Sequence, residues 1–267
     1  MRCSAWSARS SVGRPSFTAR RRCDATEAPG WRVCGMNRRP EGFMARCLLF
    51  ILPLLLSVLS AEADTIPLGG RSYEVVLPAN PDGAPLIVAL HGGGGSPGKF
   101  ARSTGLGRMA AQAGYVVIFP AGTGRRDRLT WNAGYCCGLA ARKGTDDETF
   151  LRQVIADAEA RFGIDPARVY LTGMSNGSML AETFAARNPG LVRAVAGVSG
   201  PMDTGAVRVA GKVPALIIHG TADRNVPYEG GQGEASRSGT RYASVAAVVG
   251  AFLAPWGAGG EPRPRDH

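Results

Sequence analysis

The feature that most constrains this chain is a serine set between two glycines where a strand gives way to a helix. The run GMSNG at residues 173–177 follows Val169–Thr172, a short stretch of strand-forming residues. After it, Leu180 and Phe184 lie four residues apart, which is the spacing of one face of a buried helix. A turn this sharp brings two backbones so close that only glycine fits beside them. The hydroxyl of Ser175 is then expected to be exposed at a helix N-terminus, where negative charge is favoured.

This pattern, in this setting, is the nucleophile elbow of the α/β-hydrolase fold, and a plain Gly/Ser turn is the less favoured alternative. Serine is a weak nucleophile that needs a base, usually a histidine oriented by a carboxylate, and N–H donors for the oxyanion. The run HGGG at residues 91–94 follows an upstream strand, as the oxyanion loop of this fold does. Asp223, in the run HGTAD, follows a later strand, and the order serine then aspartate is that of the fold.

The formal charge of +10 does not indicate a nucleic-acid partner, because most of it lies in one segment. Residues 1–43 carry nine arginines against three acidic residues and so contribute +6. The rest of the chain is only mildly basic and has no stripe of interleaved basic and aromatic residues.

Residues 44–63 have the pattern of a secretory signal peptide. A positive start at Met44–Arg46 precedes an apolar run at 47–59 and the small-x-small sequence Ala61-Glu62-Ala63. A transmembrane helix needs about 20 apolar residues, so this run, which contains a proline, is too short for stable membrane insertion. We therefore expect export to the extracellular space or periplasm. Residues 1–43 are interpreted as a mis-assigned extension upstream of the true start, with a transit peptide or disordered leader as the alternative.

Strands and helices alternate from residue 64 to 254, which predicts one α/β domain built on a mostly parallel sheet with helices on both faces. The helix at 145–162 is predicted to begin with a capping box of Thr145 and Glu148. Asp146 and Asp147 are interpreted as first-turn acids that stabilise the helix dipole rather than as a catalytic pair. The predicted elements are strands at 73–77, 85–90, 115–119, 169–172, 192–198 and 214–218, and helices at 105–113, 145–162 and 242–253.

Several further motifs occur in a fixed order: Ser96-Pro97, Trp131, Cys136-Cys137-Gly138, residues 165–170 (DPARVY) and residues 226–228 (VPY). With the elbow and the two His-Gly runs, they resemble a family of secreted esterases that includes extracellular polyhydroxybutyrate depolymerases and feruloyl or acetylxylan esterases. The resemblance spans about residues 69–228.

The resemblance implies that Ser175 is the nucleophile, that Asp223 is the triad acid and that the backbone amides of Gly93 and Asn176 form the oxyanion hole. It implies no cofactor and no metal, and an ester of a polymer, an aryl acid or acetate as substrate. It also implies that one of the adjacent cysteines pairs with a more distant cysteine, since two neighbours could bridge only through a strained vicinal ring.

The chain departs from the family where the catalytic histidine is expected, in a loop after one further strand. Its three histidines are His91, His219 and His267. We interpret the first two as strand-end residues bonded to backbone, and His267 as poorly placed in a Pro/Arg-rich tail at 255–267. The expectation is a chain that lacks its last strand and histidine loop and is nearly inactive. A non-catalytic module that binds esters or glycans is the alternative, and a serine peptidase of the same fold is less favoured; oligomeric state is not indicated.

Overall fold

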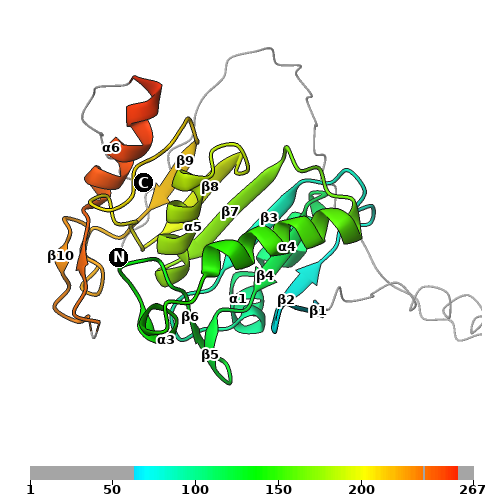
Figure 1. Ribbon diagram of the computed structural model, residues 1–267, viewed down its shortest axis with the longest axis horizontal. Coiled ribbons are helices and arrows are strands. Elements are labelled where there is room, and N and C mark those ends of the chain that lie inside the picture. Colours follow the sequence, from blue (N-terminus) through cyan, green and yellow to red (C-terminus); the bar gives the residue numbers. More distant parts are fainter. Residues whose placement is uncertain (1–62, 237, 258–267) are drawn as a thin grey trace, which may run out of the picture. The chain divides into compact units, whose positions relative to one another are not determined.

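The computed structural model describes residues 63–236 and 238–257. They form a seven-stranded sheet in the order β1-β2-β4-β3-β7-β8-β9 (Figure 1). β2 runs antiparallel to both of its neighbours, β1 and β4. The other strands of the sheet, β4, β3, β7, β8 and β9, are parallel to one another. The mostly parallel sheet predicted from the sequence is therefore confirmed. The strands are β1 (Asp64–Leu68), β2 (Arg71–Val76), β3 (Leu86–Leu90), β4 (Val116–Pro120), β7 (Val169–Met174), β8 (Ala194–Val198) and β9 (Ala215–Ile218).

Helices pack on both faces of this sheet, as predicted. α1 and α2 contact β2 and β4 on one face, whereas α5 contacts β3, β7 and β8 on the other. Two hairpins, β5–β6 and β10–β11, lie outside the main sheet. The helices are α1 (Pro97–Thr104), α2 (Leu106–Gln112), α3 (Gly138–Arg142), α4 (Asp147–Phe162), α5 (Asn176–Arg187) and α6 (Val245–Leu253), and the hairpin strands are β5 (Thr123–Arg125), β6 (Arg128–Thr130), β10 (Gly231–Gln232) and β11 (Arg241–Tyr242).

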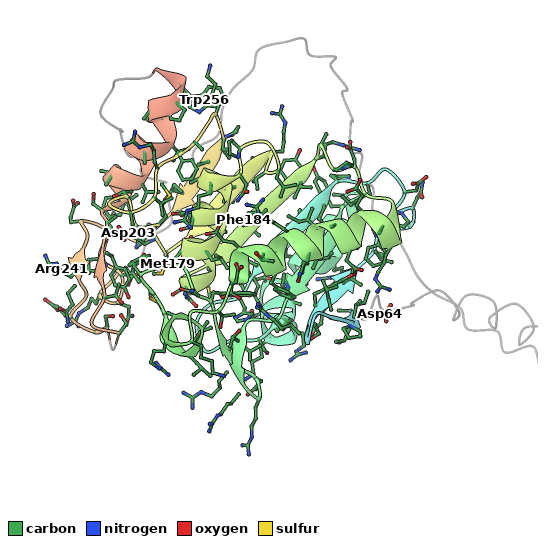
Figure 2. All side chains as sticks on the ribbon, viewed as in Figure 1. Asp64, Met179, Phe184, Asp203, Arg241 and Trp256 are labelled. Atoms are coloured by element: carbon green, nitrogen blue, oxygen red, sulfur yellow. A yellow bond between two sulfur atoms is a disulfide. The ribbon has the colours of Figure 1, made fainter. Side chains whose placement is uncertain are left out.

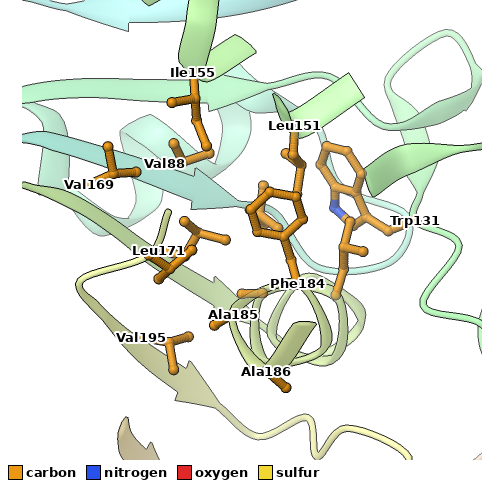
Figure 3. Packing of buried hydrophobic residues seen from close by; sticks show 14 of the residues in the cluster. Val88, Trp131, Leu151, Ile155, Val169, Leu171, Phe184, Ala185, Ala186 and Val195 are labelled. Carbon is orange, nitrogen blue, oxygen red and sulfur yellow. The ribbon is translucent and has the colours of Figure 1, made fainter. Parts of the chain in front are cut away.

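The larger apolar core lies between the sheet and helices α4, α5 and α6. Trp131, Leu151 and Phe184 pack together there at the end of the sheet that carries the elbow (Figure 3). Met179 and Phe184 belong to α5, which is buried along nearly its whole length (Figure 2). A smaller core beneath α1 and α2 contains the alternate residues of the same strands, as the two-residue period of a strand requires.

On the face that carries α1 and α2, the half formed by β7, β8 and β9 has no helix over it among the described residues. β7, β8 and β9 present Tyr170, Ala196 and Leu216 to a groove of about 470 Å³ that Leu106 closes on the α2 side. β9 is the edge strand of the described sheet, and its Leu216 and Ile218 are 58% and 50% exposed. This half of the sheet is therefore apolar and open.

Several predicted boundaries were wrong. α4 begins two residues later than expected, because Asp146 and not Thr145 is its N-cap and accepts the amide of Thr149 at 2.9 Å. The predicted capping box is thus replaced by an aspartate cap. The final helix begins at Val245 behind a Ser244 cap, and α1, which opens on Pro97, was not predicted.

Three sequence assignments fall outside the described residues. These are the extension at 1–43, the signal-peptide pattern apart from Ala63, and the last ten residues with His267. Within the described part, no helix combines the length and apolar character needed to cross a bilayer.

Candidate active site

Ser175 stands at the junction of β7 and α5, on an interior strand of the sheet. Its backbone has φ 52° and ψ −121°, a conformation that costs a non-glycine residue about 1–3 kcal/mol. Two hydrogen bonds hold this conformation: the amide of Ser175 donates to the carbonyl of Val198 at 2.8 Å, and its carbonyl accepts from Met179 at 3.0 Å. The side chain is neither fully buried nor fully exposed. The strained elbow expected from the motif is therefore present.

The flanking glycines are needed because the turn leaves no space for a side chain. A Cβ at Gly173 would lie 2.4 Å from the backbone of Gly177, and a Cβ at Gly177 would lie 2.4 Å from the carbonyl oxygen of Leu90. Real Cβ atoms essentially never approach this closely. Because a side chain at either position would meet a different part of the backbone, the motif needs both glycines.

The glycine loop after β3 lies beside the elbow. A Cβ at Gly92 would be 3.7 Å from the Cβ of Ser175, and one at Gly93 would be 3.5 Å from the Cβ of Asn176. The amide of Gly94 is already used, since it donates to the carbonyl of Leu129 at 2.7 Å. The amides of Gly93 and Asn176 donate to no other group in the described part of the chain. The structure thus brings Ser175, Gly93 and Asn176 together and leaves two backbone donors there.

The side chain of Asn176 has a separate role from its backbone. Its Oδ1 accepts the amide of Trp131 at 2.7 Å and its Nδ2 donates to the carbonyl of the same residue at 3.0 Å. Trp131 is fully buried, and its indole N–H donates to the carbonyl of His91 at 2.9 Å. Trp131 is therefore a core residue.

His91 and His219 are both bonded to backbone, as expected. Nδ1 of His91 donates to the carbonyl of Gly92 at 2.8 Å, and Nε2 accepts the amide of Gly122 at 3.2 Å. Burial lowers the pKa of His91 to about 4, so this ring is neutral at pH 7. Nε2 of His219 donates to the carbonyl of Val226 at 2.8 Å. Neither ring contacts Ser175.

Asp223 lies in the loop after β9, two strands away from the elbow strand. Its Oδ1 accepts the amides of Asn225 and Val226 at 2.8 and 3.0 Å, and its Oδ2 is 3.7 Å from Nε2 of His219. Two strand spacings separate β7 from β9 by about 10 Å, from which a carboxylate and a hydroxyl can converge on one imidazole. No histidine among the described residues occupies that position.

Two features near the site were missed or misinterpreted at the sequence level. Asp147 lies in the first turn of α4, as predicted, but it is also fully buried, pairs with Arg71 at 2.7 Å and accepts the amide of Asn132. Burial raises the pKa of Asp147 and lowers that of Arg71, while their mutual attraction opposes both shifts. Glu182, the second feature, is a buried acid on α5 behind the elbow. No sequence signal marked either residue as buried.

Cys136 and Cys137 are joined to each other by a disulfide, and Cys136 is buried in the main core. The pairing with a more distant cysteine that the family resemblance implies stays a prediction, since Cys136 and Cys137 are the only cysteines among the described residues. In the described part of the chain, His, Cys, Asp and Glu side chains do not gather into a group that could hold a metal ion.

A depression of about 330 Å³ adjoins the glycine loop and is lined by residues 91–95, by Lys99, Phe100 and Ser103 of α1, and by the exposed Met174. A larger one of about 620 Å³ lies over β1, β2 and α1 and contains none of the predicted site residues. The smaller depression is the one that borders the elbow.

The parallel sheet, the strained serine between strand and helix, and the glycine loop beside it define the α/β-hydrolase fold. Residues 71–210, more than half of the chain, match the family described as Esterase PHB depolymerase. The chain therefore belongs to this family, as the sequence motifs indicated.

Three individual similarities agree with this assignment. The provisionally named esterase NocK of Nocardia uniformis subsp. tsuyamanensis is 34% identical over 155 residues, which is 57% of this chain and 44% of that protein. A bifunctional acetylxylan esterase/xylanase of Neocallimastix patriciarum is 32% identical over 60% of this chain and 22% of its own length. A solved structure of a pOPH variant with DMSO is 14% identical and has a TM-score of 0.50. The alignment covers 73% of this chain and 76% of the pOPH chain, and it shows a likeness of fold alone. The chain spans less than half the length of the curated relatives it matches.

Proposed function

We propose that this chain is a secreted serine carboxylic ester hydrolase that acts through a covalent acyl-enzyme. The observation that carries this proposal is the strained backbone of Ser175 at φ 52°, held opposite a glycine loop at a helix N-terminus. Ser175 attacks the ester carbonyl, the alcohol leaves, and water then releases the acid. The backbone N–H groups of Gly93 and Asn176 bind the oxyanion, and their lack of other acceptors supports this role.

Asp223 is the proposed acid of the triad, and none of the described histidines is placed to act as its base. Both rings in the described part are engaged by backbone groups, and His267 is the remaining histidine of the sequence. Loss of a triad member lowers turnover by roughly a millionfold and leaves about 10³–10⁴-fold over water. We therefore expect very slow turnover unless an imidazole is supplied.

The proposed substrate is a polyester of hydroxy acids, or an aryl or acetyl ester on a plant polysaccharide. The family description and the acetylxylan relative support these two classes, and neither class needs a cofactor. Polymeric substrates are too large to enter a cell, so they fit the export predicted from residues 44–63.

Labelling by a fluorophosphonate probe, followed by peptide mapping, tests the nucleophile. Label is expected on Ser175, absent from Ser175→Ala and unchanged in Ser238→Ala, an exposed serine between β10 and β11 that has no proposed role. Label on S175A would contradict the proposal. With free imidazole added, the wild type is expected to hydrolyse p-nitrophenyl acetate faster than S175A does at the same imidazole concentration. His267→Ala tells whether His267 supplies any of the residual rate.

A non-catalytic module that binds esters or glycans is the second candidate, because no described histidine reaches the elbow. Isothermal titration with acetylated xylan and with hydroxybutyrate oligomers distinguishes the two. Binding without label or hydrolysis, even with imidazole present, favours the module.

A further inference from the structure

Glu182 is a carboxylic acid buried at the centre of the molecule, on the helix that begins at the nucleophile. It lies on α5 seven residues after Ser175 and is 1% exposed. Acidic residues are almost never fully buried unless they are partnered. Its presence here calls for a structural reason beyond packing.

Two hydrogen bonds account for the carboxyl group. Oε2 accepts the amide of Met202 at 2.8 Å, and Oε1 lies 3.2 Å from Oγ of Ser178. Gly197 of β8 leaves the space for it, since a Cβ there would lie 2.0 Å from Oε1. The carboxyl group therefore links α5 to the segment that follows β8, residues 199–202.

This segment presses directly on the elbow. A Cβ at Gly200 would lie 2.0 Å from the carbonyl oxygen of Ser175, so the two backbones are in close contact. Ser199 has φ 50°, a left-handed conformation that non-glycine residues seldom adopt. The residue before it, Val198, accepts the Ser175 amide. A shift of segment 199–202 would therefore change the backbone angles of Ser175.

A second side chain holds the same segment from another element. The hydroxyl of Tyr135 donates to the carbonyl of Pro201, and burial raises the pKa of this phenol, so it remains a donor. Tyr135 comes from the loop that contains Trp131, which Asn176 holds through two hydrogen bonds. Segment 199–202 is therefore held by α5 on one side and by this loop on the other.

We propose that Glu182, with Tyr135, is a positioning residue that acts on Ser175 through segment 199–202 and keeps the nucleophile in its strained conformation. The carboxyl group accepts the hydroxyl of Ser178 through Oε1 and the amide of Met202 through Oε2. Burial raises the pKa of Glu182 to about 8, which agrees with a neutral group at pH 7. This role for Glu182 rests on Ser175 being the nucleophile.

Glutamine at position 182 keeps both hydrogen bonds, because its NH₂ group donates to Ser178 and its oxygen accepts from Met202. Leucine fills similar volume but leaves the Met202 amide without a partner. Hydrogen exchange of peptides covering 172–178 and 198–203 measures the effect without any need for turnover. Glu182→Leu is expected to lose protection in these two peptides only, whereas E182Q and the neighbouring control Thr183→Val keep it.

Fluorophosphonate labelling supplies the functional readout, in the presence of imidazole. In E182L, the maximal labelling rate is expected to fall about 10- to 100-fold with little change in probe affinity, since a shift of about 1 Å can cost that much. E182Q is expected to restore the rate. Unchanged protection and unchanged labelling in folded E182L overturn the inference.

Tyr135→Phe keeps the test decisive if E182L does not fold. It removes only the hydroxyl donated to Pro201, and we expect a several-fold slower labelling and local loss of protection in 198–203. Wild-type behaviour of Y135F, together with unfolded E182L, assigns Glu182 to stability alone and overturns the inference. Label found on S175A contradicts the proposed nucleophile instead, so the two failures are distinguishable.

Discussion

The side chain and the backbone amide of Asn176 have separate roles, the first structural and the second chemical. Its side chain satisfies both backbone groups of Trp131, and its backbone amide is a proposed oxyanion donor. Asn176→Ala leaves one donor and one acceptor unsatisfied at a site from which water is excluded. Each such group costs about 1–3 kcal/mol, so N176A is expected to lose about 2–6 kcal/mol of unfolding free energy. The higher helix propensity of alanine offsets only about 0.5 kcal/mol of this.

Thermal and urea unfolding followed by circular dichroism measure the loss. At about 2–4 °C per kcal/mol for a domain of this size, N176A is expected to melt at least ~4 °C below the wild type. Thr183→Val is the matched control on α5, because the hydroxyl of Thr183 is buried and has no hydrogen-bond partner among the described residues. T183V should therefore melt no lower than the wild type. Labelling of Ser175 should persist in folded N176A, since the backbone amide remains. A melting temperature equal to the wild type, or well below it for T183V, would refute the reasoning.

Three further outcomes follow from the packing and the charges. Arg71→Ala leaves a buried carboxylate unpaired and should cost about 3–5 kcal/mol in urea unfolding, whereas Lys99→Ala, which breaks an exposed ion pair, should cost less than about 1 kcal/mol. Gly200→Ala places a Cβ 2.0 Å from the carbonyl oxygen of Ser175 and should destabilise the fold by about 1–3 kcal/mol or more. Gly190→Ala, where a Cβ meets open space, should be near neutral. Equal melting temperatures of the two variants would argue against the close contact. The pKa of Glu182 in the folded state, about 8, lies above its ordinary value of 4.5. The contribution of Glu182 to stability is therefore complete below pH 4.5 and is lost as pH rises towards 8. In urea unfolding at several pH values, E182Q should show a smaller loss of stability between pH 4.5 and 8 than the wild type.

The sequence predicted the parts of the fold that depend on local chemistry. The elbow could be located because its glycines are required by backbone clashes within residues 173–177 and against a single neighbouring strand. The central strands β3 and β4 were visible as apolar runs, since both of their faces are covered. The resemblance of the motifs to an esterase family was likewise confirmed by the match of residues 71–210.

What was missed depends on partners far apart in the chain. Asp147 looks like any acid in a first helical turn, and its burial is decided by Arg71, 76 residues away. Glu182 interrupts an apolar helix in a way that suggests exposure, yet α5 is buried all round and a glycine on β8 makes room for the carboxyl. The sequence could not decide between Thr145 and Asp146 as the N-cap of α4, because both residue types are favoured at that position.

The open half of the sheet couples the stability of this domain to its surroundings. Covering Leu216, Ile218 and the groove beside them lowers the free energy of the folded state. A binder therefore stabilises the fold by an amount that grows with the logarithm of its free concentration above its dissociation constant. Melting temperatures of variants are therefore comparable only at one fixed protein concentration. Detergents and apolar additives, which also occupy such surfaces, should be kept constant in the same comparisons.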